Sequence, residues 1–182
     1  MSDYHHDREG IPAGWIYLGN DNERYVLGKP GERNILVLGV NPSTAKPGDD
    51  DPTIRNVRRI AKNKGFDGWI IMNLHPQRTP HPEEMEEKAV WSENNPRAVE
   101  AVINEFRVCA IWCAWGNMID MPGKKFLYGA LARVYDVIGE YVEWYSYGNL
   151  TKDGNPRHPL YMSLTHEFQE FDVRGYLRRK GM

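Results

Sequence analysis

The sequence has little cysteine, and its two cysteines are poorly placed for a metal site. Only Cys109 and Cys113 occur among the 182 residues, and both fall in or beside one apolar segment that has the pattern of a strand. A structural zinc site needs four ligands, and this spacing matches no zinc motif. We therefore expect reduced thiols in the core, no bound metal and no cofactor.

Long apolar runs and a strong net charge are missing as well. No run approaches the roughly 20 residues of a membrane span, and the first eight residues are polar, without a signal-peptide core. We expect a cytoplasmic protein with no membrane partner. The formal net charge of −2 gives no general attraction to nucleic acid, which argues against an avid non-specific DNA binder.

What is present is a hydrophobic share of 41%, which suits one globular domain over residues 1–182, with residues 1–12 flexible. Strand and helix patterns alternate along the chain. We expect strands at 14–18, 24–27, 34–39, 69–73, 108–112 and 141–145, and helices from 51 or 53 onward and at 94–106, 123–138 and 171–179. The pattern predicts an α/β fold: a three-layer α/β/α sandwich around a central, mostly parallel four-stranded sheet, plus an N-terminal β-hairpin.

The most informative segment is residues 35–45, where a short apolar run ends in Gly39-Val-Asn41-Pro42. Glycine and proline break the strand, so Asn41 stands just past its carboxyl end, where open α/β sheets bind ligands. Other strand-like runs, and the late loop, bring further polar or aromatic residues: Asn73, His75, Trp115 and His158. We expect one cleft lined by Asn41, Ser43, Asp51, Arg55, Asn73, Trp115 and His158.

The order of these motifs resembles the uracil-DNA glycosylase superfamily. Those enzymes carry a Gly-x-(Asp or Asn)-Pro loop, a strand ending in Asn, another ending near Trp-Gly, and a late His-Pro loop. The matching segments here are 39–42, 70–73, 111–116 and 158–159. The resemblance implies a uracil-DNA-glycosylase-like fold and an N-glycosidase, a hydrolase acting on a base in DNA or in a nucleotide. The oligomeric state is not indicated.

A second set of motifs is more similar to an uncharacterised family of bacterial and phage proteins, domain of unknown function 1643. These motifs are Arg24-Tyr25, Asn41-Pro-Ser-Thr-Ala45, Asp51-Pro-Thr-Ile-Arg55, Asn73-Leu74 and Trp115-Gly116. The similarity covers about residues 20–165. It brings no established reaction with it.

The glycosylase resemblance implies three roles. Asn41 would position the attacking water, Asn73 would read the edge of a flipped base, and His158 would donate to the negative charge on the departing base. The residues alone leave simpler alternatives open, an Asx-type turn at Asn41 and a buried amide satisfying loop backbone at Asn73. The chain departs from the glycosylase pattern at two places. Ser43 replaces the usual glycine, and Leu160-Tyr161 replaces the usual wedge sequence. The second departure argues against duplex DNA as the substrate.

Asp51 and Arg55 belong to the closer family pattern. Asp51 can cap a helix or act as a general base, and Arg55, one turn later, can hold a phosphate with help from the helix amino terminus. A cap and a surface ion pair explain the same residues equally well. The candidate catalytic residues are thus Asn41, Asp51 and His158, the candidate substrate-binding residues are Ser43, Thr44, Arg55, Asn73, His75 and Trp115, and Arg24 and Arg78 are second-rank candidates.

Two functions of different classes remain open. One is an N-glycosidase, and the other is a non-catalytic module of the same fold that binds a nucleotide or nucleic acid. The polar cluster around Asn41 favours the first, and the missing wedge favours either the second or a small-molecule substrate.

Overall fold

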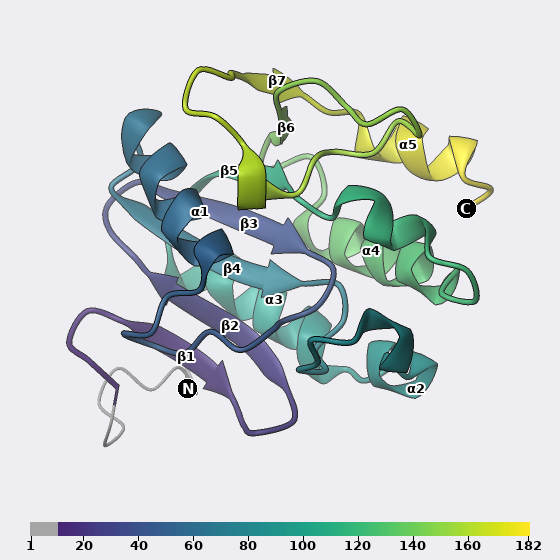
Figure 1. Ribbon diagram of the computed structural model, residues 1–182, viewed down its shortest axis with the longest axis horizontal. Coiled ribbons are helices and arrows are strands. Elements are labelled where there is room, and N and C mark those ends of the chain that lie inside the picture. Colours follow the sequence, from purple (N-terminus) through teal and green to yellow (C-terminus); the bar gives the residue numbers. More distant parts are fainter. Residues whose placement is uncertain (1–10) are drawn as a thin grey trace.

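The computed structural model describes residues 11–182, which form a mixed sheet flanked by helices (Figure 1). The expected flexible segment 1–12 therefore lies, apart from its last two residues, outside the described part. The strands are β1 (Ile16–Gly19), β2 (Arg24–Lys29), β3 (Asn34–Gly39), β4 (Gly68–Asn73), β5 (Val108–Cys113), β6 (Trp144–Tyr147) and β7 (Phe168–Glu170). The helices are α1 (Pro52–Asn63), α2 (Glu87–Val90), α3 (Asn94–Glu105), α4 (Phe126–Ile138) and α5 (Val173–Arg179).

The sheet has seven strands in the order β1-β2-β4-β3-β5-β6-β7. The four central strands β4, β3, β5 and β6 are parallel to one another. The expected hairpin, β1 and β2, joins this sheet through antiparallel pairing of β2 with β4, and β7 adds an antiparallel edge beside β6. The sheet therefore has more strands than the expected four, although its four central strands are parallel as expected.

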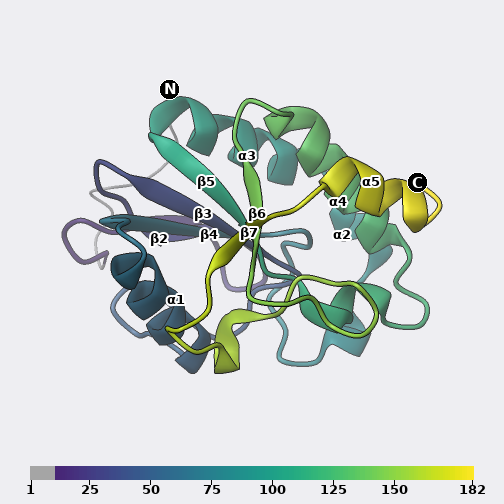
Figure 2. The same cartoon turned by 90° about the horizontal axis from the view of Figure 1, so that it is seen from above.

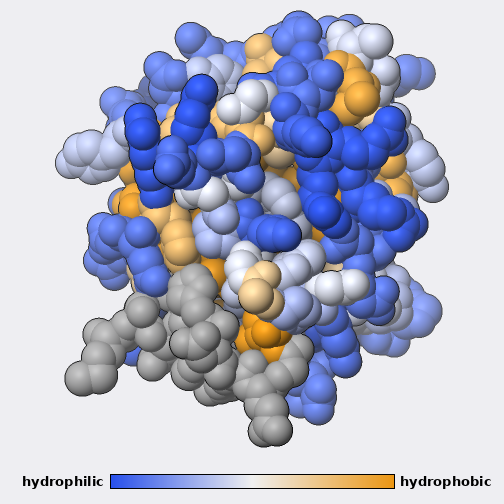
Figure 3. Space-filling view, turned by 90° about the vertical axis from the view of Figure 1, so that its left-hand side faces the viewer, coloured by the Kyte–Doolittle hydropathy of each residue, from blue (hydrophilic) through white to orange (hydrophobic). Residues whose placement is uncertain are grey.

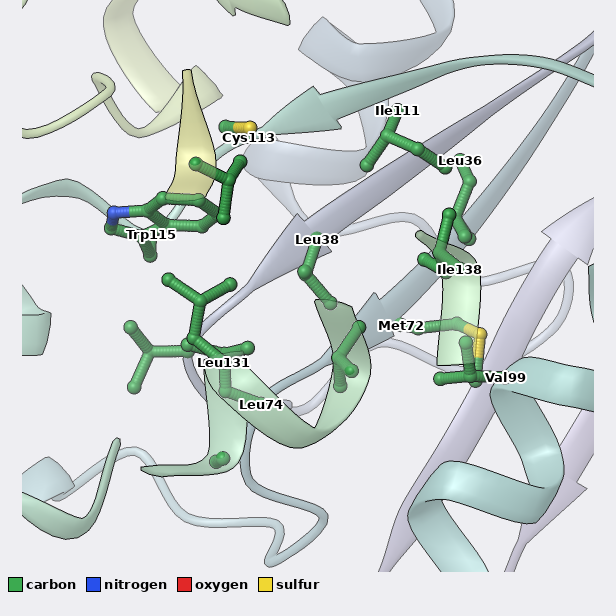
Figure 4. Packing of buried hydrophobic residues seen from close by; sticks show 14 of the residues in the cluster. Leu36, Leu38, Met72, Leu74, Val99, Ile111, Cys113, Trp115, Leu131 and Ile138 are labelled. Carbon is green, nitrogen blue, oxygen red and sulfur yellow. The ribbon is translucent and has the colours of Figure 1, made fainter. Parts of the chain in front are cut away.

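Helices cover both faces of the sheet (Figure 2). On one face α1 packs its apolar stripe, Ile54, Val57 and Ile60, against β3 and its neighbours. On the other face α2, α3, α4 and α5 cover the same strands, and Leu38 and Met72 of the sheet meet Val99 and Leu131 of the helices there (Figure 4). Side chains alternate between the two faces along a buried strand, so each central strand contributes side chains to the hydrophobic cluster on either face.

The fourth parallel strand lies three residues later than the sequence pattern suggests. Gly139, at a positive φ of 62°, ends α4, and the chain then turns through Tyr141, which is 95% exposed, before β6 begins at Trp144. The pairing of β6 with β5 begins at Trp144, so Tyr141 belongs to the turn.

Because the central strands are parallel, their carboxyl ends share one edge of the sheet. Gly39 at the end of β3 lies opposite Asn73 at the end of β4, and Leu38 lies opposite Cys113 of β5. β3 and β4 run side by side in one direction (Figure 1). The face at the other end of these strands is mostly hydrophilic, with scattered hydrophobic side chains (Figure 3). Within residues 11–182, no helix combines the length and apolarity that crossing a bilayer requires.

Candidate functional site

A small pocket opens at the carboxyl edge of the sheet. It lies between the ends of β3 and β4, the first turn of α1 and the turn at His158-Pro159, and its volume is about 70 Å³. Five of the nine candidate residues line it: Asn41, Ser43, Asp51, Asn73 and His158. Segments far apart in the chain thus bring together the polar groups that the strand-end motifs indicate.

Asn41 is held so that its side chain offers an acceptor. Its Nδ2 donates to the carbonyl oxygen of Thr79 at 2.8 Å and to that of Pro42 at 3.2 Å. Both amide hydrogens are therefore used by the loop. The carbonyl Oδ1 accepts no hydrogen bond from any described residue, so it is available to a water or a ligand in the pocket.

In Asn73 the amide nitrogen, not the oxygen, is the buried atom without a partner in the described part of the chain. The residue is 4% exposed, and its Nδ2 is buried without a hydrogen-bond partner among residues 11–182. The neighbouring strand leaves it room, because a Cβ on Gly39 would lie 2.7 Å from Asn73 Oδ1. This close approach requires the glycine of the Gly-Val-Asn-Pro motif, and the Asn73 side chain lines the pocket beside it.

His158 is exposed and stands at the mouth of the pocket. Its Nδ1 accepts from the main-chain N–H of Leu160 at 3.3 Å, so the neutral ring carries its proton on Nε2. Partial desolvation by the walls lowers the pKa of His158, and the negative charge of Asp51 opposes that shift. The ring is therefore a neutral donor at pH 7. Gly116, at φ 57°, packs against it, since a Cβ there would lie 3.3 Å from the His158 Cβ.

Asp51 is the N-cap of α1, as the sequence suggests. Its Oδ1 accepts from the main-chain N–H of Ile54 at 2.8 Å. No described residue donates to Oδ2, so one carboxylate oxygen remains for the pocket. The residue can cap the helix and take part in chemistry at the same time.

Arg24 supplies the pocket's positive charge. It is 4% exposed, its Nη1 donates to the carbonyl oxygen of Ala45 at 2.9 Å, and its Nε has no partner among the described residues. Burial lowers the pKa of Arg24 to about 10, the positive charge of Arg78 adds to this shift, and Asp51 opposes it. Arg24 therefore stays charged at neutral pH. Arg24 was only a second-rank candidate from sequence, because nothing in the pattern placed the hairpin beside β4.

Four candidates lie outside the pocket. Thr44 is exposed, and its one hydrogen bond within residues 11–182 is that of its carbonyl oxygen, which accepts from Arg78 at 3.2 Å. Arg55 is exposed, because the neighbouring residue Ile54 occupies the inner face of α1 that lines the pocket. The Arg55 guanidinium donates to the carbonyl oxygen of Asp50.

Trp115 and His75 also lie outside the pocket, and both are buried. Strand alternation puts Ala114 on the pocket side and Trp115 in the opposite core, where it is 1% exposed and packs against aromatic rings of the C-terminal segment. His75 is completely buried, and its Nε2 lies 2.9 Å from the carbonyl oxygen of Glu86. Within residues 11–182, no three His, Cys, Asp or Glu side chains are grouped to hold a metal.

Comparison with known proteins gives one match. The family model described as "Protein of unknown function (DUF1643)" matches residues 24–160, which is most of the chain and includes every residue of the pocket. No curated protein and no solved structure matches.

Proposed function

This chain belongs to the DUF1643 family, whose description names no reaction, and we propose that its pocket binds a base of a nucleotide or nucleic acid and hydrolyses the N-glycosidic bond. One observation carries the proposal. An acceptor on Asn41, an unpaired donor on Asn73 and a neutral donor on His158 surround the same small pocket.

The proposed reaction assigns one task to each group. Asn41 Oδ1 accepts a hydrogen bond from water and orients it, and the Asp51 carboxylate takes the proton as the water oxygen attacks the sugar carbon. The carbon–nitrogen bond breaks, and its electron pair leaves with the base. The Nε2–H of His158 donates to the negative charge that develops on the base, and Asn73 Nδ2 donates to an oxygen on the base edge.

We also propose that the fold is of the uracil-DNA glycosylase kind. The support is the convergence of the Gly39–Pro42 loop, Asn73 and His158-Pro159 on one pocket. Tyr161, which follows the His-Pro pair, is 91% exposed. It does not match the wedge sequence of those enzymes, so unpaired or free substrates are favoured over duplex DNA.

A non-catalytic binding module is the second candidate, and the pocket's size favours it. The volume of about 70 Å³ is less than half of the roughly 150 Å³ of an engineered cavity that binds benzene. A whole base ring would need the surrounding loops to open, whereas the polar edge of a ligand fits as the pocket stands.

The test is release of free base. Purified protein is incubated with single-stranded and duplex DNA containing uracil or hypoxanthine, and with free nucleosides and nucleotides, and the products are measured by mass spectrometry. His158→Ala removes one donor to the leaving base and is expected to lower the rate by roughly 10²–10³ while the protein stays folded. His81→Ala is the matched control, because the His81 side chain is 62% exposed on a loop.

No release from any substrate, together with nucleotide binding by the wild-type protein, would favour the binding module instead. Equal rates for His158→Ala and His81→Ala would remove His158 from the reaction.

A further inference from the structure

Among residues 11–182, Arg24 is a buried cation without an ion-pair partner. The residue is 4% exposed, the one described hydrogen bond of its side chain joins Nη1 to the carbonyl oxygen of Ala45, and it forms no ion pair with any residue of 11–182. Its Nε is buried and unpaired. A buried charge is normally paired, since removing it from water is unfavourable. An unpaired one that lines a pocket therefore points to an anion supplied from outside residues 11–182.

Asn73 gives an independent observation in the same place. Its Nδ2 is a second buried donor without a partner among the described residues, on a side chain that is also 4% exposed. Both residues line the one pocket. Four buried side-chain donors of the described residues have no partner, and the two that belong to Arg24 and Asn73 come from residues that line one pocket, which matches a ligand that brings acceptors.

The surrounding charges favour an anion as well. Arg78 lies close enough to act electrostatically on Arg24, and its guanidinium is fixed by the Tyr17 hydroxyl at 2.8 Å and the Thr44 carbonyl oxygen at 3.2 Å. Asp51 is the carboxylate that acts on Arg24, and its Oδ1 is committed to the helix cap. Two guanidinium groups thus outweigh one carboxylate at this end of the pocket.

We propose that Arg24 and Asn73 form a subsite for an anionic oxygen. The volume of about 70 Å³ suits a terminal group of few atoms. A terminal phosphate, a carboxylate and the oxygen of a departing base all share this chemistry, and Arg55, which lies outside the pocket, takes no part. The inference rests on the proposed function only in using the same pocket, because the subsite binds an anion whether or not a glycosidic bond is broken.

The experiment measures binding of inorganic phosphate, acetate and uracil to the purified protein by calorimetry and by thermal shift. Phosphate or acetate is expected to bind the wild type, and Arg24→Met is expected to weaken that binding about tenfold or more, since a charge-assisted hydrogen bond is lost. Arg33→Met is the control, because Arg33 is exposed and lies outside the pocket. Tighter binding of phosphate identifies a phosphate source, and tighter binding of acetate identifies a carboxylate. Binding of uracil alone that rises with pH as the base ionises, and that Arg24→Met weakens, identifies the base oxygen.

Asn73→Asp gives a second variant that does not depend on the folding of Arg24→Met. It places a negative charge in the pocket and is expected to abolish anion binding. In anion-free buffer Arg24→Met is expected to melt at or above the wild-type temperature, because an unpaired buried charge is removed.

Binding of neither anion and no pH-dependent binding of uracil, or equal binding by the wild type and both pocket variants, would overturn the subsite. Anion binding without any base release would keep the subsite and remove the hydrolysis. Base release that Arg24→Met leaves unchanged, without anion binding, would remove the subsite alone.

Discussion

Asn41 and Asn73 carry the same amide, yet their surroundings within residues 11–182 leave a different atom of each amide without a hydrogen-bond partner. Thr79 and Pro42 consume the amide hydrogens of Asn41 and leave an acceptor. Nothing described accepts from Asn73 Nδ2, which leaves a donor. A sequence shows that an amide stands at each strand end, but the choice between donor and acceptor depends on a carbonyl oxygen 38 positions away in the chain.

His75 is expected to make stability fall in acid. Burial lowers the pKa of His75, and its hydrogen bond with the Glu86 carbonyl oxygen only partly opposes that shift. The histidine pKa in the unfolded chain is about 6.5, so below that pH the unfolded chain binds a proton more readily than the folded state does. The contribution of His75 to stability is complete above about pH 6.5 and is lost as the pH falls below that value, by at most about 1.4 kcal/mol per pH unit.

The measurement is the urea midpoint between pH 5 and pH 8 for the wild type and for His75→Gln, whose amide can still donate to Glu86. The variant should show the shallower dependence on pH. His158, whose pKa is also lowered, contributes to both proteins and cancels in the comparison. Identical slopes would contradict the prediction.

The sequence located the strand ends better than it located side-chain directions. Asn41, Ser43, Asp51, Asn73 and His158 meet at one pocket, because parallel strands deliver their carboxyl ends to one edge. Trp115 and Arg55 are each one position away from a residue that lines the pocket, Ala114 and Ile54. Moving one residue along a strand puts the side chain on the opposite face, and moving one residue along a helix turns it by about 100°. A sequence motif does not show which of two adjacent residues faces the pocket.

At the scale of elements, α1 depends on Asp51 for its first turn. Replacing Asp51 by Ala removes the acceptor for the Ile54 N–H and is expected to lower the free energy of unfolding by about 1 kcal/mol. Asp51→Asn keeps a capping oxygen and should lose much less stability. It also removes the charge that raises the pKa of His158, so that pKa should fall further.

Urea unfolding and NMR titration of His158 check the two variants together. If Asp51→Asn is as unstable as Asp51→Ala, the charge rather than the cap stabilises the helix. An unchanged pKa of His158 would contradict the electrostatic link between the two residues.

Two strand pairings escaped the sequence pattern for different reasons. β7 has only three residues, one of them apolar, and none of the alternation that identifies a longer strand. β2 was recognised as a strand paired with β1, but its second pairing, with β4, was not, because a hairpin pattern specifies the turn and not what the outer edge contacts. That second omission matters more, since the pairing of β2 with β4 brings Arg24 to the pocket.

At the scale of the whole molecule, the pocket depends on a loop that another part of the chain holds in place. His158 follows a segment rich in glycine and proline, which has little regular structure of its own. Gly116 donates from its main-chain N–H to the carbonyl oxygen of Pro156 at 2.8 Å, and so fixes the loop to the end of β5. The Trp-Gly motif is therefore explained by the placement of His158, while Trp115 itself is buried in the core.

Asn155 is the central connection of that arrangement. It is fully buried, its Nδ2 donates to the Asp120 carboxylate at 2.6 Å, and its Oδ1 accepts from the Tyr176 hydroxyl at 2.7 Å. One side chain thus joins the loop before His158, the segment after β5 and the C-terminal helix α5. Removing it leaves the buried Tyr176 hydroxyl without this acceptor, which is unfavourable in an interior. It also removes one partner of the Asp120 carboxylate, which keeps its hydrogen bonds with Tyr128 and Lys180.

Asn155→Ala is therefore expected to lower the free energy of unfolding by roughly 2–3 kcal/mol and to weaken ligand binding, because the loop that carries His158 loses its attachment. Asn63→Ala is the control, since Asn63 is exposed at the end of α1 and should change stability by about 0.5 kcal/mol or less. Urea unfolding gives the first quantity, and calorimetry with the ligand found to bind wild-type protein gives the second. Loss of stability with full ligand binding would show that the connection supports the fold alone, and that the His158 loop keeps its position without it.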